Sequence, residues 1–437
     1  MKSIPYKVSR TDDKLTSRSG LLLVTERMER LGLSELVERY FPSVGSNRGY
    51  GAWVYVRTFL LMLHEGAGCL EDVRSLRRES ALLKLLGIGQ IPSSDALGDW
   101  LRRLGGNGVG IRALEGINRC LLGSALHRCR EVTLDIDATA ILCNKRGAQW
   151  SYLQERGYLP MVGHIEQTGQ VVAVEFRPGN VSPSQGNLEF IRCCESKLPA
   201  GVRVSAVRID AAGYQSRILD YASERGMAYA VRARLDESMK EMIRSRPQSS
   251  WKPVLGRDGE GTGEESCRFV HTMEASDKPF IVVAQRRKKR GQQRLPEGHD
   301  SGGLDTDYIY RAIATNREQM SDREVIHWYN QRAEHSENRI KELKLDLGAD
   351  RLPCSDFHAN ELYFHLCATA WNLFALLRLT LPAQWLNRRA GTVRQRLINI
   401  AGKVVCHGRQ WTLKIQSEHY ALLSEALYHT RRFALAP

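Results

Sequence analysis

The residues from Val132 to Thr139 form a segment in which apolar and acidic residues alternate. Successive side chains of a β-strand point to opposite faces, so Asp135 and Asp137 are expected to project together from one face. Two carboxylates on one face repel each other, and a bound cation usually offsets that repulsion. Carboxylate oxygens are the ligands that hard divalent metal ions prefer. The segment therefore predicts a metal site, although the solvated face of an ordinary antiparallel strand would show the same pattern.

The composition of the chain indicates a polyanionic partner. Its 437 residues carry a formal net charge of +14, and the sequence pI is about 9.4. A charge of this size favours nucleic acid, and a hydrophobic fraction of 42% is enough for ordinary globular cores. The longest apolar runs, 53–63 and 366–377, are too short to span a bilayer or are interrupted by Asn372. We therefore expect a DNA-binding or RNA-binding protein with no membrane partner.

Three other classes of protein find no support in the sequence. Residues 1–5 lack the apolar stretch of a secretory signal, so we expect the chain in the cytoplasm. The ten cysteines are scattered without a Cys-x-x-Cys pair, which argues against a zinc site or a disulfide framework. The GxxxxGK[ST] motif is absent from the sequence, so nucleotide hydrolysis by a P-loop is not expected.

Residues 1–130 are predicted to be helical, because apolar residues recur at three- and four-residue spacing between glycines and prolines. One helix is expected to begin with Ser94 as its N-cap. Its apolar stripe consists of Leu97, Trp100, Leu101 and Leu104. Arg102 and Arg103 then face outward, as on the reading helix of a DNA-binding unit. Solvated arginines on a plain helical bundle are the alternative.

The pattern changes to strands between residues 131 and 233. Strands are predicted at 132–139, 159–166, 170–177, 202–209 and 227–233, with helices at 185–197 and 215–225. The fourth strand ends at Asp210. Three strands followed by helix, strand, helix and strand is the layout of an RNase H-like α/β fold.

Two further regions flank or interrupt this core. Residues 234–318 contain glycine-rich and basic segments between short strand-like runs, which predicts a β-rich insertion. Residues 351–437 contain a long apolar helix, 359–379, and are predicted to be helical. A helix that is apolar on most faces lies in a core or an interface, so a dimer contact through it is one hypothesis.

A helix is predicted over residues 321–347, with Ser321 and Glu324 as a capping box at its start. On a regular helix of 3.6 residues per turn, four functional side chains share the side that packs on the sheet. They are Tyr329, Arg332, Glu337 and Lys344. A glutamate on this side can point towards the aspartates of the strands.

Asp137, Asp210 and Glu337 in these positions resemble the acidic triad of the DDE transposases of bacterial insertion sequences. The likeness includes the segments 134–139, 157–161 and 208–214. It is strongest to transposases that carry a β-rich insertion between the second aspartate and the glutamate, and a Tyr-Arg-Glu-Lys signature on the last helix.

The signature departs from its commonest form at one point. Four residues separate Arg332 from Glu337, whereas the commonest form has three. Glu337 keeps the usual spacing to Lys344, so we prefer it over Glu334 as the catalytic glutamate.

The resemblance implies a retroviral integrase-like, that is RNase H-like, catalytic core with an inserted β-rich subdomain. The core would consist of residues 131–233 and 319–350, interrupted by the insertion 234–318. An all-α DNA-binding domain, 1–130, would precede it, and a helical region, 351–437, would follow it.

The resemblance also implies two-metal phosphoryl transfer. Asp137 would bridge two Mg²⁺ ions, for which Mn²⁺ can substitute, and Asp210 and Glu337 would each complete the binding of one. Asp135 shares the face of Asp137 and is an alternative or additional ligand. The conserved form of the signature assigns Tyr329, Arg332 and Lys344 to contacts with DNA.

The partners implied are double-stranded DNA with terminal inverted repeats and a target DNA, with a homodimer holding the two ends on the bacterial nucleoid. Three functions remain open at this point. The first is a cut-and-paste transposase, the second is a nuclease of the same fold without strand transfer, and the third is a non-catalytic DNA-binding protein derived from a transposase.

Overall fold

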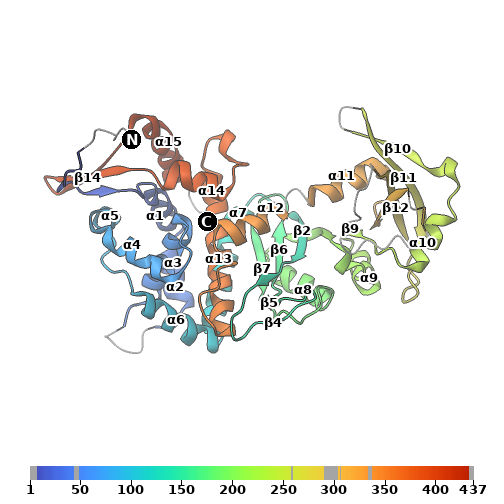
Figure 1. Ribbon diagram of the computed structural model, residues 1–437, viewed down its shortest axis with the longest axis horizontal. Helices are drawn as coiled ribbons and strands as arrows, with labels where there is room; N and C mark the ends of the chain where they lie inside the picture. The colour runs from blue at the N-terminus through green and yellow to red at the C-terminus, as the bar shows by residue number, and fades with distance from the viewer. Residues whose placement is uncertain are drawn as a thin grey trace, which may run out of the picture. The chain divides into compact units, whose positions relative to one another are not determined.

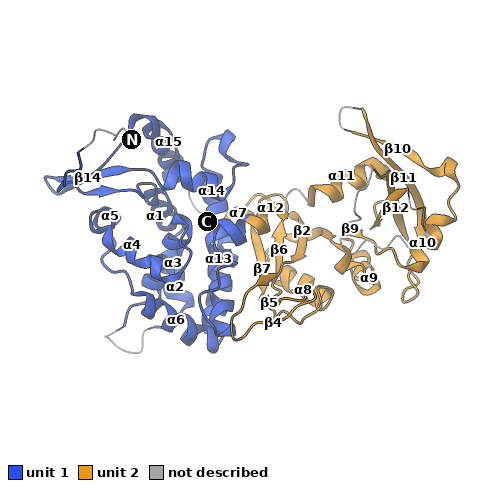
Figure 2. Cartoon of the chain, in the orientation of Figure 1, with its two compact units in different colours: residues 1–121, 342–437 blue, residues 122–341 orange. Residues whose placement is uncertain are grey.

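A computed structural model describes residues 7–43, 49–256, 259–289, 304–305, 307–332 and 337–432 of the chain. The chain forms two compact units, one made of residues 1–121 and 342–437 and the other of residues 122–341 (Figure 2). The sequence suggested separate N-terminal and C-terminal regions around a core. The structure instead places both ends of the chain in one unit.

The first unit consists mainly of helices (Figure 1). They are α1 (Leu21–Arg30), α2 (Leu33–Tyr40), α3 (Ala52–Glu65), α4 (Val73–Arg78), α5 (Ser80–Leu85), α6 (Ser94–Gly106), most of α7 (Val109–Ala125), α13 (Phe357–Arg378), α14 (Ala390–Val393) and α15 (Ser417–Arg432). A small antiparallel sheet joins them, in the order β1 (Leu15–Thr16), β14 (Gly402–His407) and β15 (Gln410–Ile415). The two end regions are therefore not purely helical as predicted, because β1 near the start of the chain pairs with β14 near its end.

Helix α13 forms the centre of the first unit. Its N-terminus is capped by Asp356, whose carboxylate accepts a 2.8 Å hydrogen bond from the Ala359 amide. Its residues from Leu362 to Leu377 are buried on all faces, against α1, α3 and α6 among others. The predicted apolar helix is thus present, but its apolar surface is covered by the same unit and does not supply a dimer interface.

Helix α6 begins one residue earlier than predicted, since Ser93, not Ser94, accepts the capping hydrogen bond from the Ala96 amide. The predicted apolar stripe is buried, and Trp100 stacks on Tyr55 with ring centroids 5.2 Å apart. Both arginines of the helix are exposed, as the stripe requires. Arg102 also forms a 2.6 Å ion pair with Asp99 on the same helix.

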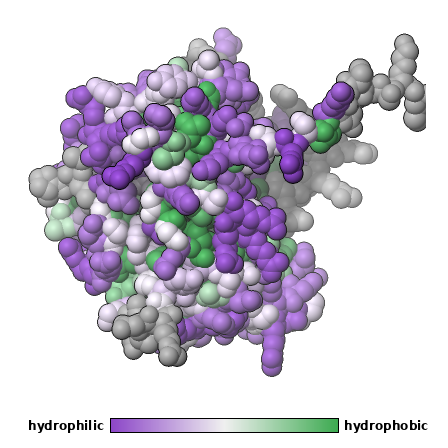
Figure 3. Space-filling view, turned by 90° about the vertical axis from the view of Figure 1, so that its left-hand side faces the viewer, coloured by the Kyte–Doolittle hydropathy of each residue, from purple (hydrophilic) through white to green (hydrophobic). Residues whose placement is uncertain are grey.

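Hydrophilic residues cover most of the face shown in Figure 3, and hydrophobic residues form small separate patches there. Within the described ranges, no helix is both long enough and apolar enough to cross a membrane.

The second unit is built on one large mixed sheet. In the described residues it contains nine strands in the order β10-β11-β12-β13-β9-β8-β2-β6-β7. Their bounds are β2 (Glu131–Ala138), β6 (Met161–Ile165), β7 (Val171–Glu175), β8 (Arg203–Ile209), β9 (Ala228–Arg232), β10 (Lys252–Leu255), β11 (Gly261–His271), β12 (Phe280–Lys288) and β13 (Tyr308–Thr315). A second small sheet, β3-β5-β4, is formed by Ile141–Leu142, Arg156–Tyr158 and Gln149–Trp150.

Helices cover both faces of the large sheet. One face packs on α8 (Asn187–Lys197), α9 (Ser216–Glu224) and α10 (Glu237–Arg244) through a core of apolar side chains. The other face packs on α11 (Asp322–Arg332), which contributes Val325 and Ile326 to a smaller core with Ile313 and Val283. We call this second face the α11 face.

The predicted order of elements over 131–233 is found in the structure. Strands β2, β6 and β7 pair antiparallel, and β8 and β9 then add in parallel to the other edge of β2. The strands predicted within 234–318 do not form a separate layer, because β13 pairs antiparallel with β9. The insertion thus extends the core sheet by four strands.

Two neighbouring glycines at the end of α6 provide a test of the packing between α6 and α13. A Cβ at Gly105 would lie 2.3 Å from the carbonyl oxygen of His358, whereas a Cβ at Gly106 would meet nothing within 4 Å. We expect Gly105→Ala to destabilise the protein by about 1–3 kcal/mol, because backbone must move to admit the methyl group. Gly106→Ala should be neutral or stabilising by up to about 1 kcal/mol.

Thermal unfolding of both variants and the wild type measures the difference. Equal transition temperatures for the two variants would contradict the described approach of the two helices.

Candidate active site

Two aspartates lie side by side at the ends of adjacent parallel strands. In the ladder between β2 and β8, Ile136 is paired with Ile209, so Asp137 and Asp210 follow in the same register. Neighbouring strands are about 4.8 Å apart, and side chains in register share a face. Both carboxylates therefore belong to the α11 face. The Asp210 carboxylate also accepts a 3.0 Å hydrogen bond from the Ala212 amide, which fixes the turn after β8.

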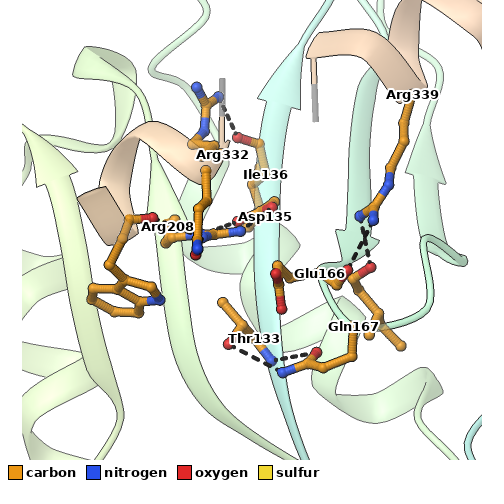
Figure 4. A network of polar contacts seen from close by, with 11 residues as sticks. Thr133, Asp135, Ile136, Glu166, Gln167, Arg208, Arg332 and Arg339 are labelled. Atoms are coloured by element: carbon orange, nitrogen blue, oxygen red, sulfur yellow. Dashed lines mark hydrogen bonds and ion pairs between the residues drawn. The ribbon is translucent and has the colours of Figure 1, made fainter. Parts of the chain in front are cut away.

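Asp135, the other acidic residue of β2, is completely buried in an ion pair with Arg208 of β8. The guanidinium donates two hydrogen bonds, Nε to Oδ1 at 2.7 Å and an amino group to Oδ2 at 2.8 Å (Figure 4). Arg208 also donates a 2.8 Å hydrogen bond to the carbonyl of Trp328 in α11. Because both oxygens of Asp135 are occupied by the arginine, we leave Asp135 out of the candidate ligand set.

Arg332, at the end of α11, is the charge partner of Asp137. Its guanidinium lies 3.3 Å from the Asp137 carboxylate. It also donates a 3.0 Å hydrogen bond to the carbonyl of Ile136 (Figure 4). The Arg332 side chain is only 5% exposed. The sequence predicted a contact between Arg332 and DNA; in the structure its guanidinium contacts the C-terminal end of β2.

The predicted helix 321–347 is described as three helical segments. The expected capping box is found, with Ser321 and Glu324 exchanging hydrogen bonds of 2.8 and 3.3 Å. Helix α11 is described as far as Arg332, α12 (Asn338–Lys341) follows, and the chain continues as a short π-helical segment, η5 (Glu342–Asp346). The rejected alternative Glu334 lies outside the described residues. The π-helical segment η5 departs from the regular period of 3.6 residues per turn on which the sharing of one side was predicted.

Glu337 lies directly before α12, and its side chain is exposed. The next residues are tied to the sheet by Arg339, which donates hydrogen bonds of 3.0 and 2.8 Å to the carbonyls of Ile165 and Glu166 (Figure 4). Those carbonyls belong to the turn between β6 and β7, so α12 is held beside the strand neighbouring β2.

The pKa of Asp137 depends on burial and on the charges around it. Burial raises this pKa from its ordinary value of 3.8 to about 6; Arg332 opposes the shift, and the charges of Asp210 and Glu337 add to it. Asp210 and Glu337 thus lie within electrostatic reach of Asp137. The site has more negative charge than Arg332 neutralises, and it favours an added cation.

Aromatic side chains surround these carboxylates. The pKa of Tyr329 in α11 is raised by burial, with smaller contributions from Asp210 and Asp137 that Arg332 and Arg232 oppose. Tyr152 is 61% exposed on the loop between β4 and β5, and the same two aspartates raise its pKa in addition to partial burial. Both phenols therefore lie near the acidic site.

The other predicted DNA contacts belong to the first unit. Lys344 lies in η5 and is half-buried, and burial lowers its pKa. Arg102 and Arg103 lie on the exposed side of α6.

Sequence reasoning did not identify Arg208 and Arg339 as positioning residues. A signal for Arg208 existed in the sequence. Arg208 precedes Asp210 by two residues and therefore lies on the same face of its strand, just as Asp135 lies on the same face as Asp137. No comparable signal identified Arg339, whose acceptors are backbone carbonyls.

All three triad residues are carboxylates, which is the donor set that a hard divalent ion prefers. Within the described part of the chain, however, no three acidic, histidine or cysteine side chains meet closely enough to form a ready-made ion site. The exposed side chain of Glu337 would have to turn towards the two aspartates to complete one.

The sequence model of the family described as Transposase DDE domain group 1 matches residues 2–432 of the chain. This match covers almost the whole chain and defines its class, a transposase of the DDE type. The chain belongs to the Transposase DDE domain group 1 family.

Among solved structures, the chain is similar to that of the piggyBac transposase in a synaptic complex with hairpin DNA. The sequence identity is 8% and the TM-score is 0.45, with 96% of this chain and 81% of that chain covered. No curated protein sequence matches the chain.

The buried pair of Asp135 and Arg208 generates a prediction about stability. Asp135→Ala leaves the Arg208 guanidinium buried without its anion, which we expect to destabilise the protein by about 3–5 kcal/mol. The double change Asp135→Leu with Arg208→Met should cost less than Asp135→Ala alone, because it removes both charges together.

Glu189→Ala, which removes the partner of the half-exposed Arg217, is the matched control and should cost at most about 1 kcal/mol. Chemical denaturation of the four proteins compares these costs. A loss for Asp135→Ala no larger than that of the control would show that the buried pair is unimportant for the fold.

The raised pKa of Asp137 predicts how stability depends on pH without divalent ions. Because the folded pKa of about 6 exceeds the unfolded value near 3.8, the folded protein binds an extra proton between these pH values. Its stability therefore falls as pH rises through this window. Asp137→Asn does not titrate, so the stability of the variant minus that of the wild type should grow by about 2–3 kcal/mol from pH 4 to pH 8.

Unfolding in EDTA at several pH values measures this difference directly. A difference that stays constant or shrinks over that range would contradict the charge crowding described for the three carboxylates.

Proposed function

We propose that this transposase cleaves DNA at the ends of its element and joins the freed ends to a target DNA. The strand order of the core, with three antiparallel strands and two parallel additions, supports an RNase H-like catalytic core. The single observation that carries the proposal is the placement of Asp137 and Asp210 in register on adjacent strands, with Glu337 within electrostatic reach.

Asp137, Asp210 and Glu337 are proposed to hold the two divalent ions, Mg²⁺ in the cell with Mn²⁺ as a substitute. Two such ions, when bound, would activate the attacking oxygen and stabilise the departing 3′ oxygen of a phosphodiester. Asp137 would be the ligand shared by both ions, because the charges of both other carboxylates act on it. The fit rests on the all-oxygen donor set and on the excess negative charge around Asp137.

The remaining side chains of the site position these carboxylates. Arg332 holds the Asp137 carboxylate at the sheet edge through its contact and its hydrogen bond to Ile136. Arg208 of β8 binds Asp135 of β2 and also donates a hydrogen bond to the Trp328 carbonyl of α11. It thereby holds the two strands and the helix together. We propose that a water oxygen first bonds to the phosphorus at the element end and releases the 3′ oxygen. The resulting 3′ hydroxyl then attacks a target phosphodiester and displaces its 3′ oxygen.

Double-stranded DNA is the proposed substrate, as terminal inverted repeats and as target. The net charge of +14 supports a polyanionic partner. The proposed DNA contacts are Tyr329, which lies near the carboxylates, and three residues of the first unit, Arg102, Arg103 and Lys344. A homodimer would hold two ends at once, although α13 is not its interface. A nuclease without strand transfer is the second candidate, since the same carboxylates would serve hydrolysis alone.

Cleavage assays test the assignment of the triad. We expect Asp137→Ala, Asp210→Ala and Glu337→Ala each to lower strand cleavage by at least about 100-fold, because each removes a ligand of the proposed ions. Glu334→Ala is the matched control for the choice of glutamate and should keep cleavage. DNA binding should survive in all four variants.

The substrate is a plasmid carrying the DNA that flanks the coding sequence, incubated with Mg²⁺ and a supercoiled target plasmid. Joined products support a transposase, and cleaved but unjoined DNA supports the nuclease. Full cleavage by Asp137→Ala would overturn the site, as would loss of cleavage by Glu334→Ala with retention by Glu337→Ala.

A further inference from the structure

A line of arginines continues the acidic site across the sheet. Ile209 of β8 is paired with Val231 of β9, so Asp210 and Arg232 follow in the same register. Arg232 therefore lies beside Asp210 on the α11 face, one strand further from Asp137. Its partly buried guanidinium is within electrostatic reach of both Asp210 and Arg311.

The next two arginines lie on the same face, each one strand further along. Arg232 is paired with Ile313 on β13, and Arg311 is two residues from Ile313 on that strand. Arg311 is in turn paired with Gln285 on β12, and Arg287 is two residues from Gln285. Side chains two residues apart on a strand share a face, and such diagonal neighbours on adjacent strands are about 7–8 Å apart. We call Arg232, Arg311 and Arg287 the arginine row.

In the described part of the chain no carboxylate forms an ion pair with these guanidinium groups, and Arg232 experiences the charge of Asp210 only at longer range. Among the described residues, no hydrogen bond or ion pair joins the arginine row to an acceptor, and Glu264, opposite Arg287 in the ladder, does not reach ion-pair distance. Neighbouring arginines of the same sheet are neutralised: Arg286 binds Glu265 and Arg268 binds Asp322, both at 2.7 Å.

The arginine row is also accessible. Arg311 and Arg287 are exposed, and Arg232 is half-buried. Helix α11 covers the apolar part of the same face with Val325 and Ile326, and it leaves Arg311 and Arg287 exposed. Cations kept close together without anions repel one another, and a polyanion relieves that repulsion.

We propose that the arginine row binds the phosphate backbone of the DNA duplex whose end lies at Asp137 and Asp210. This inference rests on the proposed function and assigns a path to its substrate. The duplex would leave the carboxylates over β9 and continue across β13 and β12. Planar guanidinium groups bind phosphate oxygens in pairs, and successive phosphates would meet successive arginines. The inserted strands would thus serve as a platform for DNA rather than as a spacer.

Salt dependence of DNA binding tests the arginine row. Each arginine that neutralises a phosphate contributes about 0.9 to the slope of log K against log salt concentration. We expect Arg311→Gln and Arg287→Gln each to lower the magnitude of this slope by about 0.9, and the double variant by about 1.8. The probe is a labelled duplex of arbitrary sequence, in EDTA, at about 50–200 mM KCl.

Arg217→Gln is the matched control. This arginine of α9 is 52% exposed but forms an ion pair with Glu189 of α8, and both helices cover the opposite face of the sheet. Its slope should equal that of the wild type. Slopes of the Arg311 and Arg287 variants equal to that of Arg217→Gln, in proteins with wild-type thermal transitions, would overturn the arginine row.

Wild-type cleavage, measured separately, distinguishes the two proposals. Reduced slopes without any cleavage by the wild type would uphold the arginine row and reject the nuclease chemistry. Cleavage by the wild type, together with unchanged slopes in the variants, would uphold the nuclease chemistry and reject the arginine row.

Discussion

The buried ion pair between Asp135 and Arg208 is the constraint on which the acidic site depends. It joins β2 to β8 through two hydrogen bonds, and its third hydrogen bond reaches the Trp328 carbonyl of α11. Taking two charges out of water is costly, so such a pair persists only when its geometry satisfies both groups. Here the two hydrogen bonds between Arg208 and Asp135 fix the register of β2 and β8, which brings Asp137 beside Asp210. The hydrogen bond to Trp328 fixes α11 against the same face of the sheet. Arg332, the last described residue of α11, then reaches Asp137.

This pair also explains why two aspartates of one strand differ in their chemistry. Both project from the same face of β2, and alternation alone makes them equivalent. Asp135 contacts an arginine that matches both its oxygens, and the pair is fully buried. Asp137 contacts Arg332, experiences the charges of two further carboxylates and keeps 19% of its side chain exposed. The residue on the neighbouring strand decides which aspartate is neutralised. The sequence of β2 alone does not contain that information.

The sequence predicted the core elements well because their signals are local. Alternating apolar residues defined β2, β6 and β7, and Ser321 with Glu324 marked the start of α11. Three features depended on long-range pairing and were missed or misplaced. They are the strand β1 that pairs with β14, the covering of α13 by its own unit, and the continuation of the core sheet into the insertion. The π-helical segment η5 was also missed, because a regular helical period was assumed throughout.

The attachment of β13 to β9 has a consequence for how this chain tolerates changes in length. The side chains of a strand alternate with a period of two, so one residue added within β9 or β13 would turn every later side chain to the other face. Arg311 would then point into the core that contains Ala312 and Tyr310, and apolar side chains would take its place among the cations. Insertions and deletions are therefore expected to accumulate in the turns between these strands. The number of residues between Ala230 and Arg232 within β9, and between Arg311 and Thr315 within β13, should remain fixed among related chains.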